Sequence, residues 1–124
     1  FYTHRVAAGP ASDIEELVEK SLDLNEYLSK NSAHVFCIRV SGDSMTGAGI
    51  FNNDLLVVDR SMKAVDGKIV VAAVNSELTL KRLKYLNKQM ILMPENPAYD
   101  PIPITEETDL KIWGVVIHVI HSLV

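Results

Sequence analysis

Short apolar runs separated by turn residues follow one another along most of this chain. Their Val, Ile and Leu residues suit a pleated, half-buried surface, so the runs indicate strands. The runs expected to form strands are 35–40, 55–58, 69–74, 78–83, 90–93 and 112–119. Gly, Asn, Asp and Ser stand between them, and no long helical pattern alternates with them. The pattern therefore predicts a mainly β domain of mostly antiparallel sheets.

The first third of the chain differs from the rest. Residues 1–12 contain a Gly-Pro pair, several small residues and no sustained period, which indicates an extended tail or linker. Residues 13–20 place apolar side chains at helical spacing after a polar cap, so we expect a short helix there. A second short turn is expected at 24–28. We therefore divide the chain into a tail, 1–12, and one compact domain, 13–124.

Composition narrows the class of protein. Hydrophobic residues make up 48% of the 124 residues, enough to fill a core and too many for a disordered chain. The formal net charge is -4, whereas nucleic-acid-binding domains usually carry a basic face. We therefore expect no direct binding to nucleic acid, while binding to a protein that itself sits on DNA stays open.

Cysteine content and hydropathy bear on the cellular compartment. Cys37 is the single cysteine, so no intrachain disulfide is available, which fits a reducing compartment. It lies in an apolar run and is expected to be a buried, inert thiol. No apolar run approaches the ~18 residues of a membrane-spanning helix, and the sequence shows no signal-peptide pattern. The chain is therefore expected to be soluble and cytoplasmic, with no membrane partner.

Two short motifs offer a nucleophile and a base. Residues 41–45 read Ser-Gly-Asp-Ser-Met, and residues 79–83 read Thr-Leu-Lys-Arg-Leu. A serine hydroxyl needs a group that takes its proton, and a lysine amine does so only when neutral. Because exposed lysine titrates near ~10.4, Lys81 must be desolvated to serve Ser44 at neutral pH. A tight turn expected at 75–77 makes Lys81 a mid-strand residue, where a partly apolar face can desolvate it.

Neighbouring residues add to this chemistry. Gly42 permits a tight turn, and the backbone amides of Asp43 and Ser44 are candidates to bind a developing oxyanion. A short apolar segment near the start of the chain contains an Ala-Gly bond. The small side chains of Ala8 and Gly9 let that bond approach a nucleophile closely, so the segment is a candidate substrate on the same chain.

Each feature has a common structural explanation when taken alone. A Ser-Gly-Asp-Ser string is most often a turn, an isolated lysine in a strand is usually solvated, and Ala-Ala-Gly is usually a flexible linker. The carboxylate of Asp43 either orients the turn or is simply solvated. His118 and His121 would face opposite sides of a strand, so we expect no metal site, and no cofactor is expected. Trp113 is expected to pack in the core or at a dimer interface.

The joint occurrence of these motifs, in this order, resembles the LexA/UmuD family of self-cleaving serine–lysine proteases. Residues 41–45 are similar to the family's nucleophile motif, 79–83 to its lysine motif, and 6–9 (Val-Ala-Ala-Gly) to its cleavage site. Further similar segments are 22–25, 94–99 and 114–120. The resemblance covers nearly all of the chain. It is closer to the polymerase-accessory members than to the repressors, except at the cleavage site, which looks like that of a repressor.

The resemblance implies a fold, an activity and partners. The family fold is a set of strongly twisted β-sheets, with C-terminal strands contributing to a homodimer. Ser44 would attack the Ala8 carbonyl, and Lys81 would take the serine proton and later deliver one to the Gly9 amine. In the DNA-damage (SOS) response, the RecA–DNA filament stimulates this self-cleavage. The shortened dimer then joins the UmuC polymerase subunit in an error-prone translesion DNA polymerase, and contacts with replicative polymerase components are also expected.

Three alternatives stay open. The first is the C-terminal self-cleaving dimerisation domain of a LexA-type transcriptional repressor, which a DNA-binding domain upstream would indicate. The second is a membrane signal peptidase, which shares the serine–lysine pair but which the lack of an anchor pattern disfavours. The third is an inert β domain with accidental motifs, which would release no fragment beginning at Gly9. Whether cleavage runs within one chain or across a dimer is also open.

Overall fold

The computed structural model describes residues 3–7, 15–17 and 34–123, with side chains from residue 34 onward. Strands make up most of these described residues. Among them there is also one single-turn 3-10 helix, η2 (Thr46–Ala48). The strands are β1 (Thr3–Ala7), β2 (Glu15–Leu17), β3 (Val35–Ser41), β4 (Leu55–Asp59), β5 (Ile69–Val74), β6 (Glu77–Leu86), β7 (Gln89–Met93), β8 (Ile102–Pro103) and β9 (Leu110–Ile120). This architecture confirms the predicted mainly β fold.

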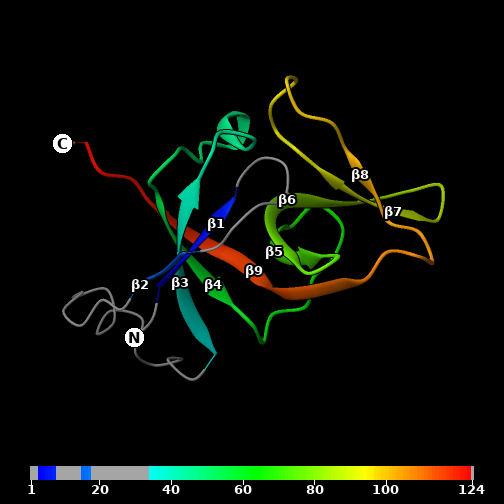
Figure 1. Ribbon diagram of the computed structural model, residues 1–124, viewed down its shortest axis with the longest axis horizontal. Helices are drawn as coiled ribbons and strands as arrows, with labels where there is room; N and C mark the ends of the chain where they lie inside the picture. Colours follow the sequence, from blue (N-terminus) through cyan, green and yellow to red (C-terminus); the bar gives the residue numbers. More distant parts are fainter. Residues whose placement is uncertain (1–2, 8–14, 18–33, 124) are drawn as a thin grey trace.

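The strands form a single sheet in the order β2-β1-β3-β4-β9-β5-β6-β7-β8. Neighbours pair antiparallel, except that β1 runs parallel to β3 and also meets β6 in a parallel bridge. Because β1 contacts both β3 and β6, the six strands β1, β3, β4, β9, β5 and β6 close into a ring. Figure 1 shows β1 lying beside β3 on one side and the hairpin of β6 and β7 extending with β8 on the other.

Tight turns join the central hairpins. Asn75 and Ser76 connect β5 to β6 with φ of 49° and 70°, and Asn87 and Lys88 connect β6 to β7 with φ of 51° and 65°. Two-residue loops with both φ values positive match the right-handed twist of the flanking strands. The turn expected between 74 and 78 is therefore present, and it fixes the register in which Val70 lies opposite Lys81.

The first third of the chain departs from expectation. The helix expected over 13–20 is wrong for Glu15–Leu17, which form β2 and pair antiparallel with β1. The open edge of β1 offers hydrogen-bond partners to the backbone N–H and C=O groups of these residues. A short helix would leave such groups unpaired at its ends. The remainder of that helix and the turn expected at 24–28 lie outside the described residues. Part of the tail, Thr3–Ala7, is strand β1 rather than a free linker.

The core lies on both faces of the sheet. One buried cluster joins β3, β4 and the 41–50 loop to β5 and β6, and Trp113 packs against it with its ring 6.3 Å from that of Phe36. A second cluster fills the side covered by β7 and β8, where Met90 is partly buried. Cys37 lies fully buried in a third. Trp113 therefore packs against the core within one chain, and Cys37 is the buried thiol expected from its apolar run.

Strand β9 joins the two parts of the sheet, which are β2-β1-β3-β4 on one side and β5-β6-β7-β8 on the other. It runs between β4 and β5 and crosses the middle of the molecule, drawn in orange to red in Figure 1. At its centre a Cβ on Gly114 would lie 2.7 Å from Val58 Cγ1 and 2.8 Å from the Asp59 carbonyl oxygen. Glycine there lets β9 approach β4 closely.

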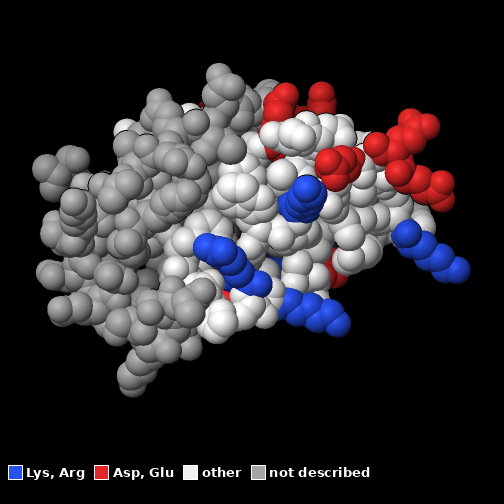
Figure 2. Space-filling view, turned by 60° about the horizontal axis from the view of Figure 1, so that its bottom comes forward, with Lys and Arg blue, Asp and Glu red and all other residues white. Residues whose placement is uncertain are grey.

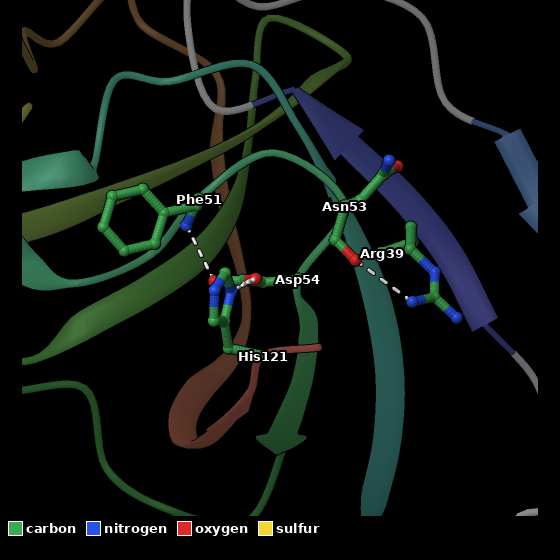
Figure 3. A network of polar contacts seen from close by, with 5 residues as sticks. All are labelled: Arg39, Phe51, Asn53, Asp54 and His121. Carbon is green, nitrogen blue, oxygen red and sulfur yellow. Dashed lines mark hydrogen bonds and ion pairs between the residues drawn. The ribbon is translucent and has the colours of Figure 1, made fainter. Parts of the chain in front are cut away.

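A polar network holds the turn before β4. Asp54 is buried, and its carboxylate accepts the Phe51 N–H at 2.7 Å and the ring nitrogen Nδ1 of His121 at 2.5 Å (Figure 3). On the other side of the turn, the Arg39 guanidinium donates to the Asn53 carbonyl at 3.1 Å. A buried carboxylate requires such partners, and here they fasten residues just past β9 to the start of β4.

Two further features concern the charges on the surface and the length of apolar helices. On the face drawn in Figure 2, basic side chains stand apart from one another with uncharged atoms between them, and acidic side chains gather along another edge. No helix in the described segments has the length and hydropathy needed to cross a membrane.

Candidate active site

Ser44 lies in a closed loop between β3 and β4. The base of the loop is fastened by Val40, whose N–H donates to the Asp54 carbonyl and whose carbonyl accepts the Asn53 N–H, both at 2.9 Å. Inside the loop Gly42 adopts φ of 103°, a conformation that favours glycine. Its N–H donates to the Asn52 side chain at 3.0 Å. The loop therefore holds Ser44 inward, where its side chain is fully buried.

Lys81 reaches the same point from β6. Its side chain is 2% exposed, although lysine is almost never buried. The amine nitrogen Nζ lies 3.2 Å from Ser44 Oγ, 2.8 Å from Thr79 Oγ1 and 3.1 Å from the Leu80 carbonyl oxygen. Thr79 is available because residues two apart on a strand share a face. The two motifs that the sequence separates by 37 positions meet here.

The surroundings of the amine favour its neutral form. Burial lowers the pKa of Lys81 from 10.5 to about 8, because the charged form loses its hydration. A neutral amine has two N–H groups and one lone pair. If the N–H groups point to Thr79 and Leu80, the lone pair faces Ser44 and can accept its proton. The geometry thus suits a serine nucleophile paired with a lysine base.

Strand β1 brings the tail to this site. Ala7 lies opposite Ser41 in the parallel ladder with β3 and opposite Thr79 in the bridge to β6. The backbone immediately before the Ala8–Gly9 bond thus lies between the two motifs, on the same chain. Ala8 and Gly9 themselves lie outside the described residues.

A loop after β7 closes the other side of the nucleophile turn. The Glu95 N–H donates to the Ser44 carbonyl at 2.8 Å, and the Gly47 N–H donates to the Glu95 carbonyl at 2.7 Å. The Tyr99 hydroxyl donates to the Asp43 carboxylate, and Asn96 Nδ2 donates to the Asp43 carbonyl at 2.9 Å. Asp43 is exposed and its carboxylate accepts the Tyr99 hydroxyl; an orienting role for it stays a prediction.

The outer side of this loop is hollowed into a shallow pocket of ≈430 Å³. Prolines, Met93 and Tyr99 line most of it. The proline-containing segment 94–103 is irregular apart from the two-residue strand β8.

The sequence predictions for the site have different outcomes. The structure brings Ser44 and Lys81 together. For the backbone amides of Asp43 and Ser44, no hydrogen-bond acceptor occurs among the residues that the structure describes, and their oxyanion role stays a prediction. Thr79 was noted as the first residue of the 79–83 motif and was given no role. Asn96 and Tyr99 lie in segment 94–99, which resembles the family, but they were given no role, because sequence spacing does not reveal their contact with the turn.

The two histidines that were considered as metal ligands have different surroundings. His118 lies in β9 opposite Val57, and His121 contacts Asp54 and the ring of Phe51. In the described part of the chain, no three His, Cys, Asp or Glu residues gather in a way that would hold a metal ion.

Comparisons with known proteins show which family this chain is similar to. A family model described as Peptidase S24-like matches residues 1–117. Protein SamA of Salmonella typhimurium is 41% identical over 121 residues, covering 98% of this chain and 84% of SamA. Protein MucA of Escherichia coli is 41% identical over 121 residues, covering 95% of this chain and 81% of MucA. LexA repressor 2 of Pseudomonas syringae pv. tomato is 48% identical over 80 residues, covering 64% of this chain and 40% of the repressor.

Proposed function

We propose that this chain, which belongs to the Peptidase S24-like family, is a serine endopeptidase. Its main substrate would be its own Ala8–Gly9 bond. The observation that carries the proposal is the buried contact of 3.2 Å between Lys81 Nζ and Ser44 Oγ. Residues 1–12 would then be the substrate segment, and 13–124 the protease and dimerisation domain.

The proposed reaction follows from the groups present. Neutral Lys81 takes the Ser44 proton as the serine oxygen attacks the Ala8 carbonyl carbon, which gives a tetrahedral oxyanion. Backbone N–H groups of Asp43 and Ser44 would stabilise that oxyanion. The intermediate collapses as Lys81 returns the proton to the Gly9 amine, leaving an acyl-enzyme that water hydrolyses with Lys81 again as base.

Docking of the tail supports cleavage within one chain. β1 pairs with β3 and β6 of its own chain, and Ala7 is one residue from the bond to be cut. A pre-positioned substrate converts a bimolecular step into an intramolecular one. We propose that the RecA–DNA filament stimulates cleavage by favouring the docked tail, a shift of population rather than a supply of chemistry.

The output of cleavage would be a changed partner surface. By analogy with UmuD, the shortened chain would act as a homodimer and as accessory subunit to a UmuC-type translesion polymerase in the SOS response, with replicative polymerase components as further partners. The basic side chains that Figure 2 draws form no continuous patch of the kind that nucleic-acid-binding faces usually carry.

Incubation of the purified chain between pH 7 and pH 10, followed by mass analysis, tests the chemistry. We expect a fragment beginning at Gly9. Its rate of formation should rise with pH through about 8 and then level off, because Lys81 must lose a proton to act. Ser44→Ala and Lys81→Ala should abolish it, and addition of RecA on single-stranded DNA should accelerate it in the wild type.

Matched substitutions control this experiment. Lys84→Ala replaces a half-buried lysine on the same strand as Lys81, and Ser61→Ala replaces an exposed serine after β4. Both variants should cleave at the wild-type rate. Cleavage that survives in Ser44→Ala, or a rate that does not change with pH, would contradict the proposed mechanism.

The second candidate is the C-terminal domain of a LexA-type repressor. It is favoured by the 48% identity to LexA repressor 2 over 80 residues. Both candidates predict the same self-cleavage. The full-length gene product separates them, because a DNA-binding domain encoded upstream of Phe1 would favour the repressor.

A further inference from the structure

We propose that the segment Pro94–Tyr99 is a positioning clamp for the nucleophile, in which Tyr99 and Asn96 hold Asp43 so that the adjacent Ser44 faces Lys81. The inference rests on the proposed self-cleavage. It assigns positioning roles to two residues that do not touch the reacting atoms.

The clamp holds Asp43 at both its side chain and its backbone. The Tyr99 hydroxyl donates to carboxylate oxygen Oδ1, and Asn96 Nδ2 donates to the Asp43 carbonyl at 2.9 Å. The Thr46 N–H also donates to that carbonyl, at 3.4 Å. The Asp43 carbonyl belongs to the peptide unit that contains the Ser44 N–H. Fixing its orientation therefore also fixes the direction of a proposed oxyanion donor.

The segment is in turn anchored to the strand that carries the base. Arg82, next to Lys81 on β6, contacts Glu95 Oε1 through Nε at 2.5 Å and donates to the Gly67 carbonyl at 2.6 Å. Glu95 donates its N–H to the Ser44 carbonyl at 2.8 Å. One loop thus connects the turn after β3 to β6, and it sets the position of the serine relative to the lysine.

Gly47 allows this close approach. A Cβ at that position would lie 2.6 Å from the Glu95 carbonyl oxygen, which accepts the Gly47 N–H. Any larger residue would push the segment away from the nucleophile turn.

The exposure of Asp43 and Tyr99 distinguishes a positioning role from a contribution to the stability of the fold. Asp43 is exposed and Tyr99 half-buried, and bonds at such positions contribute little to overall stability. Ser44 beside them is fully buried. Loss of the Tyr99 bond should therefore slow the reaction while leaving the fold intact.

The first test compares two tyrosines. Tyr99→Phe should lower the first-order rate constant of self-cleavage about tenfold, with a melting temperature within about 2 °C of the wild type. Tyr85→Phe removes an exposed hydroxyl on β6 and should leave the rate unchanged. The pH at half-maximal rate, which Lys81 sets, should stay the same in all three proteins. A merely structural defect would expose Lys81 and move that pH toward 10.5.

The second test identifies the bond itself. Asp43→Asn keeps an acceptor oxygen for Tyr99 and should cleave within about twofold of the wild type. Asp43→Ala removes the acceptor and should match Tyr99→Phe. Because both changes break one bond, the double variant Asp43→Ala/Tyr99→Phe should be no slower than either single variant.

The outcomes separate failure of the clamp from failure of the proposed function. If the wild type cleaves and Tyr99→Phe is equally fast, or if the two losses multiply in the double variant, the clamp is wrong. If the wild type releases no Gly9 fragment, the proposed function is wrong. The clamp is then tested by labelling Ser44 with a fluorophosphonate: about tenfold slower labelling in Tyr99→Phe supports it, and equal labelling overturns it.

Discussion

At the scale of single residues, the buried Lys81 lowers stability at neutral pH. The lowering of its pKa from 10.5 to about 8 corresponds to roughly 3 kcal/mol against the charged form. Between those two values the folded chain binds fewer protons at this site than the unfolded chain. The contribution of Lys81 to the free energy of unfolding therefore rises with pH across that window.

Replacing Lys81 with an apolar residue of similar length should relieve this destabilisation. We expect Lys81→Met to raise the free energy of unfolding at pH 7 by about 1–3 kcal/mol, after subtraction of what the lost hydrogen bonds to Ser44, Thr79 and Leu80 contribute. The gain should shrink as pH rises from 8 to 10.5. Urea unfolding at pH 7 and pH 10 measures both values.

Lys84→Met, on the same strand and half-buried, is the control and should change stability little. A gain in Lys81→Met that is equal at the two pH values would contradict the assignment of the destabilisation to charge burial.

Sequence reasoning could identify this dyad because both motifs are local strings whose chemistry is recognisable. It predicted that Lys81 must be desolvated, which burial on β6 provides. It could not identify the roles of Asn96 and Tyr99, because those residues lie 53 and 56 positions from Asp43 along the chain. Their contacts with Asp43 are present in the folded structure and are not evident from sequence spacing.

At the scale of elements, the two tight turns are open to improvement. Ser76 and Lys88 each adopt positive φ at the second position of a two-residue hairpin loop, after an asparagine. Asn-Gly is the preferred sequence for that conformation. We expect Ser76→Gly and Lys88→Gly each to raise the free energy of unfolding by about 0.5–1 kcal/mol, measured by urea unfolding.

Ser61 supplies a contrasting position. Its φ is not positive, and its hydroxyl donates to Asp59 Oδ1 at 2.6 Å. Ser61→Gly should therefore lower stability, since it loses that bond and adds backbone freedom. Stabilisation by all three glycines would show that the turn argument is not specific.

The strands predicted from apolar runs were found with one to three residues added at their ends, except 69–74, which matches β5. The elements that were missed are strands because they pair with a neighbouring strand, not because they form apolar runs. β2 exists because β1 offers an edge, and the two residues of β8 are strand because they pair with β7. Local propensity carries no record of such pairing.

At the scale of the whole molecule, the comparisons confirm the predicted resemblance to the LexA/UmuD family. The closure of the ring through β1 was not foreseen, because a bridge between Ala7 and Thr79 spans more than half of the chain. The surface also shows an apolar end. Phe51, Val119, Ile120 and Leu123 are all exposed by more than a third. Val119 and Ile120 end β9 beside the start of β4, and the Phe51 ring contacts that of His121, just past β9.

This apolar end is where we expect the proposed homodimer to form. An apolar surface of this kind marks an interaction site more often than a solvated face. Ile120→Asp should convert the dimer to a monomer, because a carboxylate in an apolar interface loses its hydration. Light scattering after size-exclusion chromatography measures the mass.

Leu86→Asp is the control at a distant position, since Leu86 is 51% exposed on the hairpin of β6 and β7; it should remain dimeric. A wild-type monomer, or a dimer that persists in Ile120→Asp, would contradict this interface.

Strand β1 gives the proposed reaction an unusual product. It lies upstream of the Ala8–Gly9 bond, so cleavage turns a tethered strand into a separate peptide. A short tether holds a segment at an effective concentration of order millimolar, and cutting it lowers that concentration to that of the peptide in solution. Cleavage would thus open the ring of strands by mass action, with no further change in the protein. Each molecule would complete a single turnover and keep, as its lasting product, the unpaired edges of β2, β3 and β6.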